Sequence, residues 1–528
     1  MAKHPDAGFD GLRRAEIVAA LSLATDLAIG QPMEFAIGVT GVAIRLAKAA
    51  GMDVEGQRDV YWFCLLRHIG CNAESHAFAA LVGDEVEFNR LILAADKTKA
   101  ADVLPVLLAM VRRANAGAGV LATAAALIGA LATSKQIAAD VIGSHCDTAV
   151  RLARRMGFRE AVVVALGQAE ESWNGAGLPA GLSGAAISRV ALVGSIAFDH
   201  GTLCAALPKE RAAAVIAERG GKLYDPALVD LFVRHHGAIT EKDGETQPWE
   251  TALALEPEPV SVLDRREFED ACLVMADFAD MKSPRLAGHS RQVSALAAAA
   301  ATACGLPAAD VDALRLAGLL HDIGYAAVSS RLRLGGAALS EGEREQLRLH
   351  PYFAQRILSR TPALARLGAL AATHHERLDG SGFHRGLRHA EIGLSARILA
   401  AAEAFQALLE GRAGEAGRSP EAAAAMLRTE IRAGRIDSQA GEAVLAGAGQ
   451  RSRRAAAVGD GLTAREIEVL RLLARGCSAK DVARALMIAP KTARNHVQNL
   501  YAKIGVASRA GATLYAVEHG LVVAGAPP

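Results

Sequence analysis

The chain has 528 residues, of which 51% are hydrophobic, and a formal net charge of +1. This near-neutral balance excludes a protein that coats nucleic acid along its whole length, so any affinity for DNA must be local. The length allows about three domains of roughly 150 residues each. Alanine and arginine are abundant and strand formers seldom alternate, which predicts an all-α fold.

Cysteine usage and hydropathy predict a cytoplasmic protein. The seven cysteines are odd in number and form no CxxC pair, which favours reduced thiols over a disulfide framework. The first 14 residues lack the apolar core of a signal peptide, and the alanine-rich runs are too short to cross a bilayer. We therefore expect no membrane contact.

The first half of the chain contains a diverged copy of a later segment. Residues 65–70 read LLRHIG, and residues 319–324 read LLHDIG, 254 positions further on. A second match, AEESWNGAGLPAGL at 169–182 against HHERLDGSGFHRGL at 374–387, has a shift of 205 positions. An internal duplication predicts two domains of the same architecture.

Two segments lie outside the repeat. Residues 78–134 have no counterpart in the later copy and predict two helices, broken at Gly117 and Gly119 because glycine interrupts helices. Residues 240–261 carry acidic residues and three prolines without a helical period, which indicates a linker. We expect a first domain at 10–240, a linker at 241–262, a second domain at 263–449, a linker at 450–461 and a third domain at 462–528.

The second domain contains the residues that most resemble a metal site. An apolar helix runs into His321 and Asp322, an adjacent imidazole and carboxylate, a donor mixture that suits Fe, Mn or Zn. Alone, such a pair is more often a helix-end cap beside a turn carboxylate. Further potential ligands lie on both sides of it: His289, His350, His374, His375 and Glu403.

These motifs resemble the HD-GYP branch of the HD phosphohydrolases, because LLHDIG, a His-Pro pair and HHERLDGSG follow one another in the family's order. The resemblance implies an all-helical domain with two or three metal ions, commonly iron or manganese. It implies that metal-bound water attacks a phosphodiester, with cyclic di-GMP as the branch's known substrate. The implied catalytic residues are His321 and Asp322, and the implied ligands of two ions are His289, His321, Asp322, His350, His374, His375 and Glu403.

Three departures from the family leave turnover open. Tyr325 stands where the family has a lysine, so a cation that could meet a phosphate is missing. His384 replaces the proline of the GYP motif, which makes the loop less rigid. Glu403 stands where the family usually has aspartate and is one methylene longer.

The secondary structure around these residues is also predicted. Residues 331–338 are expected to form a loop, and Ser340 with Glu343 has the spacing of a capping box that begins the helix before His350. Glu376 and Asp379 are expected to organise the glycine loop rather than to catalyse.

By the same resemblance the first domain has lost its metal site. The shifts place Arg67 at the position of His321, His68 at that of Asp322, and Ala169 and Glu170 at those of the twin histidines. Phe35 stands at the position of His289, and His145 alone is retained, at that of His350. We expect no dinuclear centre in this domain. Its role as a packing partner or as a sensor of an anionic ligand stays open.

The C-terminal residues predict four short helices. Thr463 and Glu466 form a capping box, Gly476 ends the first helix, and residues 481–486 form the second. Pro490 fits the first turn of the third, although Ala489 lacks the hydroxyl of a good N-cap.

This segment resembles the LuxR-type helix-turn-helix along its whole length. The resemblance implies that the third helix enters the major groove of double-stranded DNA and that the fourth, residues 509–519, forms a homodimer face. Residues 462–528 contain nine Lys or Arg and four Asp or Glu, a local excess that favours phosphate contact. The implied base contacts are Arg494, Asn495 and Gln498, and the implied phosphate contacts are Lys491, Thr492 and Lys503.

Two hypotheses follow. In the first, the protein is a transcription regulator whose HD-GYP-like domain binds metal and a phosphate ligand of the cyclic dinucleotide class, which alters DNA binding. In the second, the protein is an active metal-dependent phosphodiesterase whose DNA-binding head serves for targeting.

Overall fold

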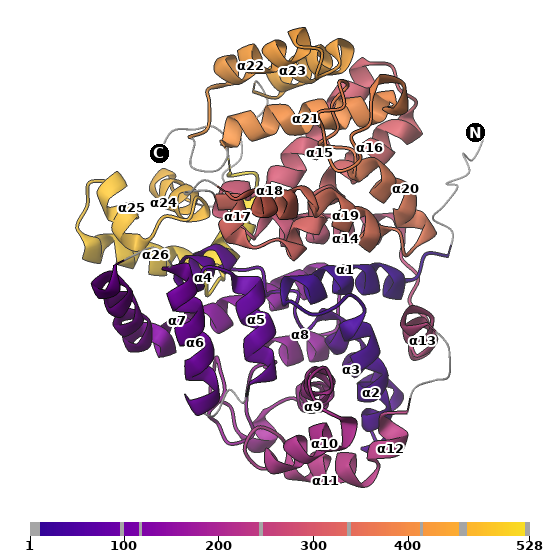
Figure 1. Cartoon of the computed structure of the whole chain (residues 1–528), viewed down its shortest axis with the longest axis vertical. Coiled ribbons are helices and arrows are strands. Elements are labelled where there is room, and N and C mark those ends of the chain that lie inside the picture. The colour runs from indigo at the N-terminus through magenta and orange to yellow at the C-terminus, as the bar shows by residue number, and fades with distance from the viewer. Residues whose placement is uncertain are drawn as a thin grey trace. The chain divides into compact units, whose positions relative to one another are not determined.

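The computed structural model describes residues 11–95, 100–115, 119–241, 247–334, 339–411, 416–452 and 462–522. The described residues form α-helices and four short 3-10 helices, with isolated β-bridges and no strand among them (Figure 1). The all-α prediction is therefore confirmed. The chain divides into two compact units, Met1–Glu267 and Phe268–Pro528.

The first unit contains the earlier copy of the repeat and its insertion. Its helices are α1 (Arg14–Ala28), α2 (Phe35–Ala49), α3 (Val54–Leu66), α4 (Ser75–Val82), α5 (Glu85–Ala94), α6 (Ala100–Ala114), α7 (Val120–Arg155), α8 (Glu160–Gly167), η1 (Gly184–Ala186), α9 (Arg189–Cys204), α10 (Lys209–Glu218), α11 (Pro226–Arg234), α12 (His236–Ile239) and α13 (Pro248–Ala254), with the start of α14 (Arg265–Asp280).

The second unit contains the later copy and the C-terminal helices. Its elements are η2 (Pro284–Leu286), α15 (His289–Ala303), α16 (Ala308–Leu320), η3 (Ile323–Ala327), α17 (Ser330–Leu334), α18 (Glu341–Arg348), α19 (His350–Leu358), α20 (Pro362–Ala371), η4 (His389–Glu391), α21 (Leu394–Glu410), α22 (Pro420–Arg432), α23 (Ser438–Ser452), α24 (Ala464–Ala474), α25 (Ala479–Ala485), α26 (Pro490–Ile504) and α27 (Arg509–Glu518).

The duplication is visible in matched hydrogen bonds. Buried Asp26 accepts from the backbone N–H of Ala36 at 3.1 Å, and buried Asp280 accepts from that of Ser290 at 3.0 Å. Both pairs join the end of one helix to the start of the next, at the shift of 254 positions read from the sequence. The sequence repeat is thus a repeat of local structure.

The glycine loops of the two copies are also built alike. Glu171 accepts from the backbone N–H groups of Ala180 and Leu182 at 2.8 and 2.9 Å. Glu376 accepts from those of residues 385 and 387 at 2.9 and 2.8 Å. In each copy a buried carboxylate therefore closes the glycine loop, which agrees with the prediction that Glu376 organises this loop.

Gly324 permits a close helix contact beside the His-Asp pair. A Cβ atom at Gly324 would lie 1.9 Å from the carbonyl oxygen of His350, and one at Gly70 would lie 2.0 Å from that of His145. A side chain at Gly324 would push α19 away, and a side chain at Gly70 would push α7 away. Glycine at position 324 therefore lets η3, which directly follows Asp322, approach α19, which begins at His350.

Three details differ from the sequence predictions. Helix α13 lies within the segment expected to be a linker without helix. Helix α17 covers residues 331–334 of the expected loop, and residues 335–338 of that loop lie outside the described residues. Of the two glycines expected to break the insertion, Gly119 directly precedes the 36-residue α7 and Gly117 lies outside the described residues; the insertion contains α5 and α6 as well as the start of α7. In each case a helix stabilised by packing contradicts a weak local pattern.

Alanine-rich helices pack closely around the second copy's core. Helix α15 packs on α16, α21 and α23. The buried core there includes Val293, Leu399, Phe405 and Leu427. Small side chains let these helices approach, so residues from separate helices meet at one end of the bundle.

The C-terminal helices have their own core and the predicted caps. Thr463 and Glu466 form the capping box of α24, and Val469, Leu473 and Leu500 lie in the core. Ala489 makes no side-chain cap to α26, as expected. Among the described residues, no helix has the length and apolarity that a membrane crossing requires.

Candidate functional site

The candidate metal-binding side chains lie at helix ends. His289 is the first residue of α15, His350 is the first of α19, and His321 directly follows α16. The twin histidines follow α20, and Glu403 lies within α21. Each of these seven side chains is at least 95% buried: His289, His321, Asp322, His350, His374, His375 and Glu403.

The side chains converge on the carboxylate of Asp322. Its Oδ1 atom lies 3.3 Å from Nε2 of His321, 3.5 Å from Nε2 of His374 and 3.8 Å from Nε2 of His350. Oδ1 is buried and has no hydrogen-bond partner. A buried carboxylate oxygen surrounded by ring nitrogens at these distances is the arrangement of donors around a shared cation.

Backbone carbonyls orient three of the imidazoles. Nδ1 of His321 donates to the carbonyl oxygen of Gly318 at 2.7 Å, and Nδ1 of His350 donates to that of Leu347 at 2.7 Å. Nδ1 of His374 donates to the carbonyl oxygen of Ala371 at 2.6 Å. Because a carbonyl only accepts, each Nδ1 carries a proton and each Nε2 is left facing Asp322. Metal-binding histidines are held in this way.

A carboxylate orients the fourth imidazole. Glu410 accepts from Nδ1 of His289 at 2.7 Å, and Nε2 of His289 lies 3.0 Å from Oε2 of Glu403 and 3.3 Å from Nε2 of His321. Burial lowers the pKa of His289, but Glu410 and then Glu403 outweigh it and raise that pKa well above its ordinary value. The sequence reading did not include Glu410, although it lies two turns after Glu403 on α21.

Two sets of three residues could each hold a metal ion. Within each set, one potential ligand atom per residue lies within 4.8 Å of the others. The sets are His289, His321 and Asp322, and His350, His374 and His375. The orphaned Oδ1 of Asp322 lies between them, so the donors present fit two adjacent ions that share this carboxylate.

Burial favours the neutral form of two imidazoles in the second set, those of His350 and His374. It lowers the pKa of His374 to about 4, with the positive charge of His321 adding to the effect, and it lowers that of His350 well below its ordinary value. Neutral imidazole is the form that binds a metal ion.

Tyr325, which stands at the position where the family has a lysine, lies at the edge of the site together with Arg333. The Tyr325 ring stacks on that of His350, with centroids 3.7 Å apart and an interplanar angle of 13°. The guanidinium carbon of Arg333 lies 3.5 Å from the Tyr325 ring centroid, and its Nη2 donates to Oδ2 of Asp322 at 2.7 Å. The sequence reading missed Arg333, because it placed this residue in a featureless loop.

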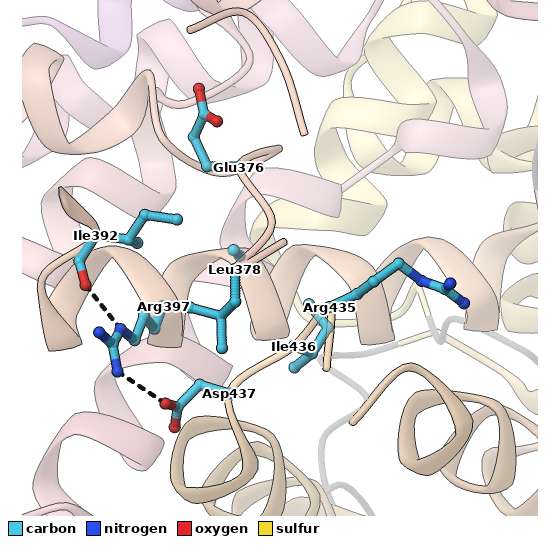
Figure 2. Close-up of a pocket in the computed structure, with 8 residues that line it drawn as sticks. Glu376, Leu378, Ile392, Arg397, Arg435, Ile436 and Asp437 are labelled. Atoms are coloured by element: carbon cyan, nitrogen blue, oxygen red, sulfur yellow. Dashed lines mark hydrogen bonds and ion pairs between the residues drawn. The ribbon is translucent and has the colours of Figure 1, made fainter. Parts of the chain in front are cut away.

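A small hollow behind the glycine loop offers no free polar groups to a ligand. Figure 2 shows Arg397 between Ile392 and Asp437, to which it donates at 2.7 and 3.0 Å. Arg435 is paired with Glu430 at 2.6 Å. These contacts pair the charged side chains that line the hollow with other groups of the protein. We therefore interpret the hollow as part of the packing behind the glycine loop.

In the first copy an arginine lies where the second copy has His321. Arg67 donates to Oγ of Ser195 at 2.8 Å and lies 3.3 Å from a carboxylate oxygen of Glu170. Nε2 of His145 lies 3.0 Å from the carbonyl oxygen of Ala73 rather than facing other imidazoles. The guanidinium already has anionic and hydroxyl partners, and the choice between a packing role and a sensory role stays a prediction.

Helix α26 presents the residues expected to read DNA. All six expected contacts are exposed on this helix: Lys491, Thr492, Arg494, Asn495, Gln498 and Lys503. Ala493 and Leu500 on the opposite side are buried in the core. Lys503 pairs with Glu466 at 2.8 Å. A phosphate contact by Lys503 would therefore compete with this ion pair.

Two family models match the chain. Residues 273–440 match the HD domain, and residues 460–516 match the luxR family of bacterial regulatory proteins. A crystal structure of a cyclic GMP-AMP specific phosphodiesterase from Vibrio cholerae has a TM-score of 0.54 at 24% identity. The match covers 83% of this chain and 98% of that one, and it shows the shared fold.

Curated relatives support both matches. The 3'3'-cGAMP-specific phosphodiesterase 3 of Vibrio cholerae is 27% identical over 79% of this chain and 91% of that protein. The cyclic di-GMP phosphodiesterase of Thermotoga maritima is 36% identical over 26% of this chain and 38% of that protein. The probable transcriptional regulatory protein NarL of Mycobacterium tuberculosis is 35% identical over 28% of this chain and 69% of that protein. The chain is thus an HD-domain protein with a C-terminal domain of the LuxR family of bacterial regulatory proteins.

Proposed function

We propose that the HD domain binds two divalent cations, iron or manganese, together with a cyclic dinucleotide, and that this ligand controls DNA binding by the LuxR-type domain. The observation that carries the proposal is the convergence of four imidazoles and Glu403 around Asp322 in a buried site. Such a donor set has little use in a protein that only packs, since burying unpaired polar groups costs stability.

Each residue of the site has a role in this proposal. One ion is held by His289, His321 and Asp322, with Glu403 beside it, and the other by His350, His374 and His375. Asp322 is shared by both ions. Bound in this way, the ions would supply Lewis acidity toward a phosphate and lower the pKa of water. The protein contributes a dry, rigid cage whose rings cannot turn away from the ligand.

An active phosphodiesterase is the second candidate function. Relatives named as cyclic dinucleotide phosphodiesterases favour it, and so does a donor set that includes both His321 and Asp322. Tyr325 in place of a lysine favours binding without turnover, because that position carries no cation to stabilise the negative charge on the reacting phosphate. The two candidates share the metal site and differ only in the chemical step.

One experiment separates them. The full chain, loaded with Mn²⁺ or Fe²⁺, is incubated with cyclic di-GMP or 3'3'-cGAMP, and linear products are resolved by ion-exchange chromatography while calorimetry measures binding. Binding without product supports the regulator, and product supports the enzyme. Asp322→Ala is the control, which should lose both. A wild-type chain that retains no metal and binds neither dinucleotide would refute both candidates.

The DNA-binding half of the proposal has its own test. We propose that α26 enters the major groove and that α27 forms the face of a homodimer, with Arg494, Asn495 and Gln498 reading bases. Lys491, Thr492 and Lys503 would contact phosphates. Fragment selection from genomic DNA, repeated with and without the dinucleotide, should yield one sequence whose affinity changes with the ligand. Unchanged affinity would remove the regulatory link but leave DNA binding intact.

A further inference from the structure

A largely buried arginine beside the candidate metal ligands has one nitrogen without a hydrogen-bond partner among the described residues. Nη2 of Arg333 donates to Oδ2 of Asp322 at 2.7 Å, and the side chain is 16% exposed. Nη1 is buried and has no hydrogen-bond partner in the part of the chain that the structure describes. Because both nitrogens are bonded to the same carbon, Nη1 lies next to the carboxylate that the metal ligands surround.

The surrounding contacts fix the position of this guanidinium. Its carbon lies 3.5 Å from the centroid of the Tyr325 ring, which stacks in turn on His350. Lys282, itself buried, donates to the carbonyl oxygens of Ala326 and Val328 at 3.1 and 2.6 Å and so anchors the turn after Tyr325. The stack of guanidinium, phenol and imidazole connects Arg333 to a candidate metal ligand and restricts its movement.

A simple counter-ion role does not account for this arrangement. Of the two carboxylate oxygens of Asp322, Arg333 contacts only Oδ2, while Oδ1 faces the histidines without a hydrogen bond. A guanidinium that served only to neutralise the carboxylate would gain more from a bidentate contact, which this fork is shaped to make. A donor left unused beside a carboxylate and inside a buried site costs free energy unless a ligand satisfies it.

We propose that Arg333 binds a non-bridging phosphate oxygen of the ligand through Nη1 and so supplies the cation that Tyr325 cannot. Arginine is suited to this task because it stays charged and presents several fixed N–H groups to an oxyanion. The inference rests on the proposed function, since it requires a phosphate ligand at the metal site. It assigns Arg333 as a binding residue, with the Tyr325 ring as its support.

The test uses the full chain loaded with Mn²⁺, with inorganic phosphate as the probe. Calorimetry measures phosphate affinity, and elemental analysis measures bound manganese, for wild type, Arg333→Ala and Arg333→Gln. Glutamine keeps a polar side chain without charge, and its amide nitrogen ends two bonds short of the position of Nη2. Arg331→Ala is the matched control, because Arg331 lies on the same short helix, is exposed and pairs with Glu343. Thermal unfolding establishes that each variant is folded.

We expect both Arg333 variants to bind phosphate about tenfold more weakly, as the loss of one charge-assisted hydrogen bond predicts. Their manganese content should equal that of wild type, and Arg331→Ala should match wild type in both measurements. Unchanged phosphate affinity in folded Arg333→Gln would overturn the proposal. So would a loss of manganese large enough to account for the weaker phosphate binding, since Arg333 would then act only by holding Asp322. A wild-type chain that binds neither manganese nor phosphate would instead refute the proposed function itself.

Discussion

His350 and His374 face each other through Nε2 atoms that are only 2.9 Å apart. Each ring already donates its Nδ1 proton to a backbone carbonyl, so in the neutral rings both Nε2 atoms carry a lone pair. Two lone pairs at this distance repel unless a cation lies near both. The contact is therefore a specific reason to expect a metal ion, beyond the mere number of histidines.

Removing one of these rings should remove one ion. We expect His374→Ala to bind about one manganese ion where wild type binds about two, because the set around His350 would keep only two imidazoles. Elemental analysis of dialysed protein measures the content. His389→Ala, which changes an exposed histidine after the glycine loop, should leave it unchanged. Equal manganese in wild type and His374→Ala would show that this set holds no ion.

The carboxylate behind His289 should tune metal affinity. Glu410 is 8% exposed and accepts from Nδ1 of His289 at 2.7 Å. In Glu410→Gln the imidazole loses its anionic partner, and we expect a 10- to 100-fold weaker affinity for manganese, as outer-shell partners commonly provide. Competition with a fluorescent chelator measures the constant.

An exposed carboxylate provides the control for that measurement. Glu421 begins α22 on the surface, and Glu421→Gln removes the same charge away from the site. Its manganese affinity should equal that of wild type. If Glu410→Gln also binds manganese like wild type, His289 is not a ligand, and the first set would consist of His321 and Asp322 alone.

A short motif can be placed from the sequence where it coincides with a helix end. His321 and Asp322 could be located because an apolar helix precedes them and a glycine that admits no Cβ follows them. The repeat was equally readable, since its shifts of 254 and 205 positions recur in the hydrogen bonds of Asp26 and Glu171. These features depend on local order along the chain.

The contacts that sequence reasoning missed join distant segments. Arg333 reaches Asp322 across 11 residues of a segment that lacks helical periodicity, and its helix, α17, forms by packing. Glu410 reaches His289 across 121 residues. Neither partner could be chosen from its own neighbours, because an arginine or a glutamate on a helix usually faces solvent.

One difference between the copies predicts a pH dependence of stability. His200 stands where the second copy has Phe405, and its Nε2 lies 3.2 Å from that of His236. Burial, together with the charge of His236, lowers the pKa of His200 to about 4. The unfolded chain would protonate this group below about pH 6.5. The free energy of unfolding should therefore fall as the pH falls from 6.5 to 4, by about 2–3 kcal/mol from this group.

The variant His200→Phe tests this dependence, because phenylalanine is the residue at the matching position of the second copy. Scanning calorimetry at pH 7.5, 6 and 5 should show a smaller drop in melting temperature for His200→Phe than for wild type. His235→Gln, which changes an exposed neighbour, should keep the wild-type slope. Parallel slopes for all three proteins would mean that His200 is protonated in the folded state.

The exposed cations of α26 should set the salt dependence of DNA binding. Lys491 lies in the first turn, where the N–H groups of the helix also favour a phosphate. Each neutralised phosphate releases counterions, so log affinity falls with log salt by about 0.9 per contact. Lys491→Ala should lower the magnitude of this slope by about one on any duplex. Arg494→Ala should also reduce the preference for the selected sequence, as base contacts do.

Fluorescence anisotropy with two unrelated duplexes at four salt concentrations separates these effects. Arg432→Ala removes an exposed charge from α22 in the HD domain and should change neither the slope nor the sequence preference. If Lys491→Ala and Arg432→Ala behave alike, α26 does not meet the phosphates. If the wild-type slope is near zero, the C-terminal helices do not bind DNA by the electrostatic route that their excess of positive charge predicts.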